Sequence, residues 1–192
     1  MKCSVFNLTI LSIVFAILSF HDTYAQSEEA EEPQYLSAGL EVDVLPYVLN
    51  GYMGAAWVSK NHFRLRALFA HVKMPDFITP DEFTNNKINS FAFLLDYYQK
   101  KDLSGFWIGG GPVIWDGSIQ SEQRRSSVKY KSYLLNGSIG YSLFLTKNLY
   151  LSPWAGLSFR FAGDKNITVD GYDYDPPFLN PELSLKLGWR FF

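Results

Sequence analysis

Residues that could perform acid–base or nucleophilic chemistry are few in this chain of 192 residues. After residue 25 the only histidines are His62 and His71, and Ser90 is the hydroxyl that the next predicted strand brings nearest to His71. The alternation of the two segments places His71 with Phe69 and Ser90 with Asp96, on opposite faces of a sheet. A nucleophile and its base must approach to about 3 Å. The sequence therefore predicts no catalytic residue, and we expect that the protein is not an enzyme.

Patterns for metal or phosphate binding are equally weak. The stretch GDKNITVDGYDYDPP concentrates carboxylates that could collect calcium, but their spacing is not that of an EF-hand loop. An acidic surface loop is the better interpretation of these residues, which are Asp164, Asp170, Asp173 and Asp175. The glycines at 109–111 lack the Lys and Ser or Thr of a phosphate-binding loop, and Arg124 and Arg125 are expected to be solvated. We expect no metal site and no cofactor.

Charge and aromatic content restrict the class of protein. Lys and Arg number 17 against 19 Asp and Glu, which gives a net charge of −2. A nucleic-acid-binding protein would need a strongly basic face, so no nucleic-acid partner is expected. Aromatic residues make up 17% of the chain, and many of them lie near the ends of predicted strands.

The N-terminal residues have the pattern of an export signal. Lys2 precedes an apolar run at 8–20 and a small-residue cleavage site, so residues 1–25 are predicted to be a signal peptide. The run is shorter than the roughly 17 to 25 residues of a spanning helix. The single cysteine, Cys3, lies in this segment, so the mature chain is expected to form no disulfide. Residues 26–34, QSEEAEEPQ, are predicted to be an acidic periplasmic linker.

Residues 35–192 alternate apolar and small or polar side chains with a period of two, which is typical of β-strands. Eight segments carry the alternation: Leu36–Leu45, Tyr47–Val58, His62–Val72, Ile88–Tyr98, Leu103–Ile114, Ser127–Phe144, Leu149–Ala162 and Phe178–Phe192. The first turn is placed either at Leu45-Pro46 or at Asn50-Gly51. Pro153 removes a hydrogen-bond donor inside the seventh segment, so either a bulge there or a lower start to that strand is expected.

The connections between these segments alternate in length along the chain. Tight connections are predicted at 59–61, 99–102 and 145–148, and long polar ones at 73–87, 115–126 and 163–177. Short turns at one end and long loops at the other are typical of a transmembrane β-barrel. The sequence thus predicts an all-β fold, an eight-stranded antiparallel transmembrane β-barrel with up-and-down meander topology and three long external loops.

The two faces of the predicted strands differ in a way that assigns one to lipid. One face is bulky and apolar over about 9 to 11 residues in most strands, the length that crosses a bilayer at a tilt. The other is mostly Gly, Ala and Ser and carries a predicted lumenal charge network: Glu41, Asp43, Arg64, Arg66, Asp96, Arg160, Glu182 and Lys186. These charges are expected to pair, because an isolated buried charge is costly.

The aromatic residues near the strand ends fit either an interfacial girdle or an ordinary core, and the sequence leaves both open. They are Tyr97, Tyr98, Trp107, Trp115, Tyr133, Tyr141, Tyr150, Trp154 and Trp189.

The last segment, PELSLKLGWRFF, resembles the C-terminal signal by which bacterial outer-membrane barrels are recognised for insertion, and the mature chain resembles the small OmpX/OmpA-type eight-stranded family. In that family the final residue is usually Phe. Here Trp189 and Phe191 keep the alternation and Phe192 is added, so the insertion signal is assigned to all three. The resemblance implies a Gram-negative outer membrane, contact with lipid and lipopolysaccharide, and recognition by the barrel-insertion machinery.

A structural or surface-interaction role is the function that this resemblance and the absence of catalytic residues favour. Three alternatives remain open. A narrow pore would be biased by Arg64, Arg66 and Arg160; a lipid-modifying enzyme would use His71; a soluble lipocalin-like periplasmic carrier would turn the apolar face inward. The sequence identifies no partner for the external loops.

Overall fold

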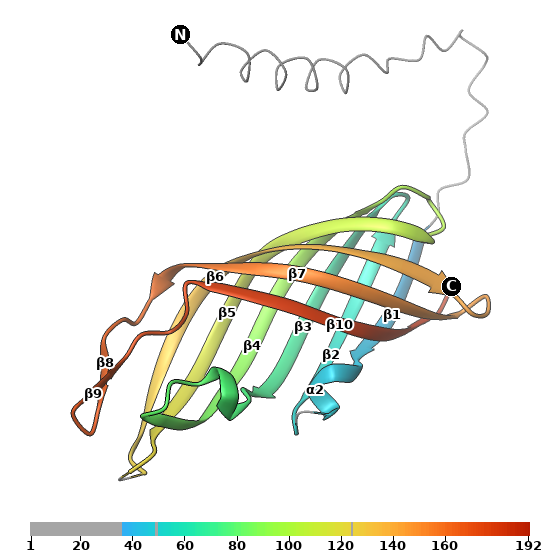
Figure 1. Ribbon diagram of the computed structural model, residues 1–192. Coiled ribbons are helices and arrows are strands. Elements are labelled where there is room, and N and C mark those ends of the chain that lie inside the picture. Colours follow the sequence, from blue (N-terminus) through green and yellow to red (C-terminus); the bar gives the residue numbers. More distant parts are fainter. Residues whose placement is uncertain (1–35, 49, 124) are drawn as a thin grey trace, which may run out of the picture. The chain divides into compact units, whose positions relative to one another are not determined.

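The computed structural model describes residues 36–192 except 49 and 124, so the predicted signal peptide and acidic linker lie outside the described residues. Eight antiparallel strands close into a barrel in the order β1-β10-β7-β6-β5-β4-β3-β2 (Figure 1). Their bounds are β1 (Leu36–Asp43), β2 (Tyr52–Lys60), β3 (Phe63–Lys73), β4 (Phe83–Tyr98), β5 (Gly105–Ser121), β6 (Ser127–Phe144), β7 (Leu149–Gly163) and β10 (Leu179–Arg190). The predicted fold class is confirmed.

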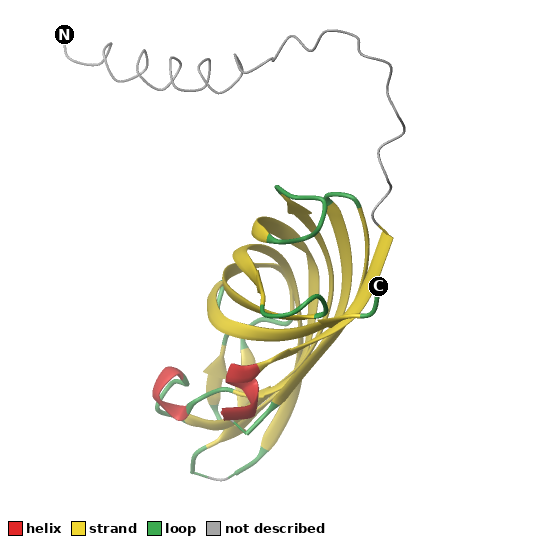
Figure 2. Ribbon diagram, turned by 90° about the vertical axis from the view of Figure 1, so that its right-hand side faces the viewer, coloured by secondary structure: helices red, strands yellow, loops and turns green. Residues whose placement is uncertain are grey.

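The two ends of the barrel differ in their connections. At the short-turn end, β2 meets β3, β4 meets β5, and β6 meets β7 through brief turns, two of which use the left-handed residues Asn61 (φ 53°) and Leu103 (φ 63°). At the loop end lie the helix α2 (Val44–Val48), the 3-10 turn η1 (Asp76–Ile78) and a separate hairpin of β8 (Ile167–Val169) and β9 (Tyr172–Tyr174). Figure 2 shows both helices at this loop end.

The barrel wall is taller on one side than on the other. Strands β1, β2 and β3 contain 8, 9 and 11 residues, whereas β4 to β7 contain 16, 17, 18 and 15. The long loop predicted at 115–126 is therefore wrong, because β5 continues to Ser121 and only 122–126 connect it to β6. The polar residues there alternate with inward side chains such as Ile119, which is fully buried, so the strand continues beyond the apolar face.

The first connection differs from both predicted turns. The strand expected from Tyr47 is wrong at its start, because Val44–Val48 form a helical turn and β2 begins at Tyr52. Pro46 is tolerated in the first turn of a helix, where its missing N–H is not needed. Asn50 takes a left-handed φ of 57°, and the Gly51 N–H donates to the Pro46 carbonyl over 2.7 Å. Both candidate turn sites thus belong to one longer connection.

Pro153 lies inside β7, where it pairs with Leu185 of β10. The predicted bulge at Pro153 is wrong. The ladder between β6 and β7 keeps one register from Gly140↔Trp154 to Leu143↔Leu151 and shifts only between Tyr133 and Leu134. The strand continues past the missing donor because its β10 side stays paired.

Charged and apolar side chains occupy opposite sides of the barrel wall. The bulky apolar face points outward, from Leu185 at 37% exposed to Leu183 at 73%, whereas Arg66 and Asp96 on the inner face are 0% exposed. Within the described residues, no helix is both long and apolar enough to cross a membrane.

Candidate functional site: the charged lumen and its cover

Four of the predicted lumenal charges form one ion cluster. The Arg64 Nη1 lies 2.6 Å from the Glu41 Oε1, and the Arg64 Nε lies 2.9 Å from the Asp96 Oδ2. Arg66 contacts both oxygens of Asp96: its Nε lies 2.7 Å from Oδ2, and its Nη2 lies 2.9 Å from Oδ1. The Arg66 Nη1 lies 3.5 Å from the Glu41 Oε2. Register explains the meeting, because Arg64 pairs directly with Asp96 across β3 and β4.

Aromatic side chains surround this cluster inside the barrel. The Tyr150 phenol donates to the Glu41 Oε1 over 2.7 Å. The Arg64 guanidinium carbon lies 5.0 Å from the ring centre of Tyr98, and that of Arg66 lies 5.1 Å from Trp107. Cation–π contacts of this kind gain strength away from water. The ring faces therefore stabilise the cations where water would otherwise solvate them.

Lys186 is held differently, between two indole rings. Its Nζ lies 4.0 Å from the ring centre of Trp154 and 4.9 Å from that of Trp107. Trp154 in turn donates its Nε1 hydrogen to the Asp43 Oδ2 over 2.8 Å, and Ser184 donates to the other oxygen of Asp43. Asp43 and Lys186 are direct cross-strand partners on β1 and β10. The Trp154 indole therefore connects the ammonium to the carboxylate.

The remaining two predicted charges lie outside this group. Glu182 accepts a hydrogen bond from the Ser158 hydroxyl over 2.7 Å. Arg160 pairs with Asp175 at 2.8 Å and donates to the Asp164 carbonyl over 3.0 Å, both in the segment that carries β8 and β9. The eight predicted residues thus all have inward or loop-end contacts, but they form separate groups and not one continuous network.

Glycines lie opposite the lumenal aromatics, a pairing that was not predicted from the sequence. Four direct cross-strand pairs join a glycine to an aromatic residue that lies over it: Gly39↔Trp57, Gly117↔Tyr130, Gly140↔Trp107 and Gly188↔Tyr150. A side-chain carbon at each glycine would collide with the partner's ring atoms. The glycines let the rings lie flat along the inner wall, a known stabilising pair in curved sheets. A glycine at an inward position of an alternating strand was the available signal.

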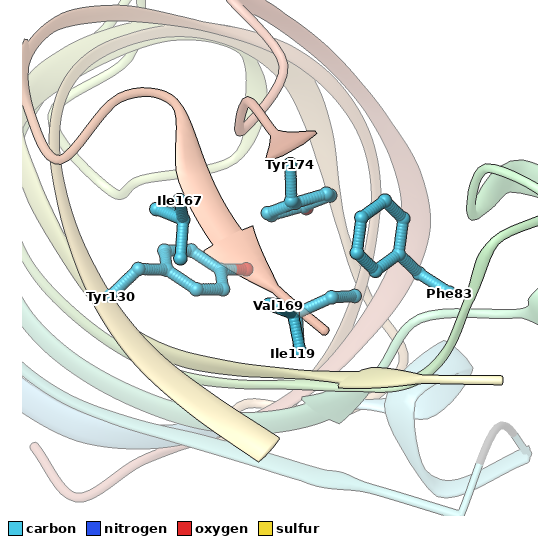
Figure 3. Close-up of a cluster of buried hydrophobic side chains, with 6 residues drawn as sticks. All are labelled: Phe83, Ile119, Tyr130, Ile167, Val169 and Tyr174. Carbon is cyan, nitrogen blue, oxygen red and sulfur yellow. The ribbon is translucent and has the colours of Figure 1, made fainter. Parts of the chain in front are cut away.

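An apolar layer and a cover lie on the loop side of the charges. The layer consists of Ala92, Leu94, Val113 and Leu134, with Leu68 and Trp115 packed against it. Beyond it, the β8–β9 hairpin inserts Ile167, Val169 and Tyr174 among Phe83, Ile119 and Tyr130 of the barrel (Figure 3). We call these six residues the outer cluster.

Hydrogen bonds fasten the hairpin to the barrel at the outer cluster. The Asn86 Nδ2 donates to the Tyr174 phenol over 3.0 Å, and the Tyr130 phenol donates to the Asn86 Oδ1 over 2.9 Å. Burial raises the pKa of Tyr174 above its ordinary value, against the opposing effect of these hydrogen bonds. The segment expected to be an acidic loop is thus a folded cover with an apolar inner side.

The carboxylates of that segment contact protein groups. Asp173 accepts from the Thr168 hydroxyl over 2.7 Å, and Asp164 accepts from the Lys131 N–H over 2.8 Å. In the described part of the chain, no three His, Cys, Asp or Glu side chains come close enough to hold a metal ion. Arg124 lies outside the described residues.

The aromatic candidates divide between lumen and exterior. Tyr98, Trp107 and Tyr150 are almost fully buried inside, and Trp115 and Trp154 pack with inner clusters. The four that point outward are Tyr97, Tyr133, Tyr141 and Trp189. Of the nine candidates, only these four could belong to an interfacial girdle, because they lie on the apolar outer face of their strands.

The histidines make local contacts at the two rims. The His62 Nδ1 lies 2.9 Å from the Tyr98 carbonyl oxygen, and the His71 Nδ1 lies 2.7 Å from the Asn89 Oδ1. Ser90 pairs with Ala70 and faces the other side of the sheet from His71. The structure does not bring the candidate base and nucleophile together.

The predicted insertion signal lies on the exterior at the short-turn end. Trp189 pairs with Leu40, and the Phe191 N–H donates to the Ala38 carbonyl over 2.9 Å. Phe191 and Phe192 are both exposed. Their role in recognition stays a prediction.

No protein-family model and no curated protein matches the chain. Among solved structures, it is similar to the N-terminal β-barrel domain of OprF from Pseudomonas aeruginosa, with a TM-score of 0.53, 11% identity, and coverage of 83% of this chain and 100% of that one. It is also similar to Neisserial surface protein A, with a TM-score of 0.46, 13% identity, and coverage of 83% and 98%. The similarity to the OprF domain confirms the β-barrel fold.

Proposed function

We propose that this protein is an integral barrel of a Gram-negative outer membrane, with a closed lumen and a structural or surface-interaction role that involves no catalysis. The observation that carries the proposal is the inverted distribution of side chains. Glu41, Arg64, Arg66 and Asp96 are at most 2% exposed, whereas outward residues such as Phe93 and Leu135 are 63% and 55% exposed. Water is a poor solvent for that exterior, and lipid is a good one.

The height of the apolar exterior supports the membrane placement. On β6 the outward residues are apolar from Leu143 to Tyr133, and the next two outward residues are Lys131 and Lys129. A strand needs about 9 to 11 residues to cross a bilayer at a tilt, which this interval supplies. A soluble lipocalin-like carrier would require the reverse, with the apolar face inside.

The contents of the lumen favour a closed barrel over the narrow-pore alternative. Arg64 and Arg66 are paired with Glu41 and Asp96, and Arg160 is paired with Asp175. An eight-stranded barrel has an interior that side chains just fill, and here an apolar layer and the outer cluster follow the charges. An ion would have to break the buried pairs and displace the hairpin, so we expect no steady conductance.

The test combines fractionation, gel mobility and conductance. The mature protein is expected in the detergent-extracted outer membrane, to migrate faster unboiled than boiled, and to leave a planar bilayer at its baseline conductance. Recovery in the soluble periplasmic fraction without a heat-dependent shift would overturn the membrane placement. Steady current steps would overturn only the closed lumen. A change in lipid A mass that requires His71, tested with His71→Ala, would overturn the non-catalytic role.

A further inference from the structure

A row of lysines crosses the outside of β3 to β6 at the loop end. The cross-strand register places Lys73 opposite Lys87, Lys87 opposite Ser118, and Ser118 opposite Lys129. Lys131, two residues before Tyr133 on β6, lies one row nearer the apolar band. Neighbouring strands are about 4.8 Å apart, so these four ammonium groups gather on a surface about 15 Å wide.

A carboxylate lies beside this row at Lys131, whose backbone N–H donates to the Asp164 Oδ2 over 2.8 Å. No ion pair links the side chain of Lys73, Lys87, Lys129 or Lys131 to a carboxylate within the described residues. The nearest outward acid by register is Asp116, opposite Lys131. Like charges directly opposite each other in a sheet are destabilising, so Lys73 and Lys87 would be stabilised by an external anion.

An apolar groove lies on the same outer surface, closer to the middle of the membrane. It has a volume of about 520 Å³ and a floor of small residues, Gly54, Ala56 and Ala67, between Leu40 on one side and Phe91 and Phe93 on the other. Register explains the hollow, because Ala56 and Ala67 are direct partners on β2 and β3. Bulkier side chains surround these three positions.

The groove and the lysines are aligned along the strands. Phe69 and Phe91, on the edge of the groove, are paired, and Lys73 and Lys87 are paired four residues further along each strand. Four residues of strand span about 13 Å. The row between them contains Tyr52, His71 and Asn89, with the Tyr52 and His71 rings stacked at 5.5 Å. A headgroup at the lysines would therefore place an acyl chain in the groove.

We propose that the outer face of β1 to β6 binds one lipopolysaccharide-class lipid, its phosphates on Lys73, Lys87, Lys129 and Lys131 and one acyl chain in the groove floored by Gly54, Ala56 and Ala67. The inference rests on the proposed membrane placement. Lysine is a common phosphate ligand. Four lysines in one patch exceed what a single phosphate needs, which favours a lipid with two phosphates over a glycerophospholipid with one.

The test uses the mature protein reconstituted in nanodiscs of phosphatidylcholine, with bis-phosphorylated lipid A, monophosphoryl lipid A and phosphatidylglycerol as separate probes scored by native mass spectrometry. A basic residue at an anionic lipid surface contributes about a fivefold gain in affinity. Lys73→Gln with Lys87→Gln is therefore expected to weaken lipid A binding about 25-fold. The matched control replaces Lys60 and Lys100, at the short-turn end, and is expected to leave binding unchanged.

A second pair of variants tests the groove. Ala67→Trp fills its floor and is expected to reduce lipid A retention. Gly137→Trp is not, because Gly137 lies on β6 outside the groove and an added side-chain carbon there meets no atom within 4 Å. Equal losses in both lysine variants, or equal losses in both tryptophan variants, would overturn the site. Equal affinity for phosphatidylglycerol and lipid A would overturn the choice of lipid. A protein that is absent from the outer membrane would instead fail the fractionation test above, which separates the two proposals.

Discussion

Asp96 is the residue on which the lumenal ion cluster depends most directly. It is fully buried and receives both arginines, Arg64 through one nitrogen at 2.9 Å and Arg66 through two at 2.7 and 2.9 Å. The substitution Asp96→Asn preserves the size of the side chain and removes its charge. It leaves two buried guanidinium groups with Glu41 as the one carboxylate of the cluster. The new side-chain amide would also point an N–H donor at the guanidinium groups of Arg64 and Arg66, which are themselves donors.

The expected magnitude follows from these contacts. Hydrogen bonds to charged groups contribute about 1.5 to 3 kcal/mol each, but bonds that share one carboxylate are not additive. Breaking a buried pair by removing one partner typically costs about 3 to 5 kcal/mol. We therefore expect Asp96→Asn to lower the free energy of unfolding by about 4 kcal/mol, close to a thousandfold in the folding equilibrium.

The assay is reversible denaturant unfolding in lipid vesicles, followed by tryptophan fluorescence and by the mobility of the unboiled protein. Asp81→Asn is the control, because Asp81 is exposed at the loop end and surface changes usually stay within about 0.5 kcal/mol. Adding Arg66→Gln to Asp96→Asn should cost less than the sum of the two single changes, because the second removes a cation that the first left unpaired. A loss for Asp96→Asn within about 1 kcal/mol of the control, or strict additivity, would refute the reasoning.

Two further predictions concern the lumenal wall and the cover. Gly140→Leu should lower the free energy of unfolding by about 2 kcal/mol, because a side-chain carbon there would lie 2.8 Å from the Trp107 Nε1. The control Gly137→Leu should not, because a side-chain carbon at Gly137 meets no atom within 4 Å. Equal losses of the two variants in denaturant titrations would contradict the stabilising contact between Gly140 and Trp107. Since burial raises the Tyr174 pKa, its neutral phenol should stabilise the docked hairpin below the ordinary tyrosine pKa of about 10 and lose that contribution above it. In a phenolate absorbance titration, Tyr174→Phe should remove a tyrosine that ionises above pH 10. If the variant instead lacks a tyrosine that ionises near or below pH 10, the pKa of Tyr174 is not raised and the prediction is wrong.

The alternation of apolar and polar side chains along each strand was sufficient to predict much of the fold. The inward positions of Glu41, Arg64, Asp96 and Lys186 follow from parity alone, because successive side chains point to opposite faces. Parity could not decide whether Trp107 and Tyr150 lie in the lumen or in a lipid-facing girdle, because an aromatic residue suits both places. Their place is set by the glycines opposite, Gly140 and Gly188, and that pairing depends on the register between strands distant in sequence.

The hairpin over the barrel mouth shows the same limit. The segment 163–177 is rich in Asp and Gly, which indicates a loop, and two three-residue strands are too short to show a period. Ile167, Val169 and Tyr174 become buried only because Phe83, Ile119 and Tyr130 of three other strands surround them. The helical turn at Val44–Val48 and the pairing of Pro153 with β10 likewise depend on neighbouring segments.

The sequence by itself determined the number of barrel strands, their antiparallel meander and which face of each strand is apolar. These properties depend on a period of two and on side-chain polarity along one strand. Only the tertiary structure decided which charges meet, which aromatics enter the lumen, how the hairpin closes it, and where lysines and an apolar groove align on the exterior. The physical reason is that each of these depends on the stagger between strands. That stagger is set by closing the whole sheet into a barrel, and no single segment encodes it.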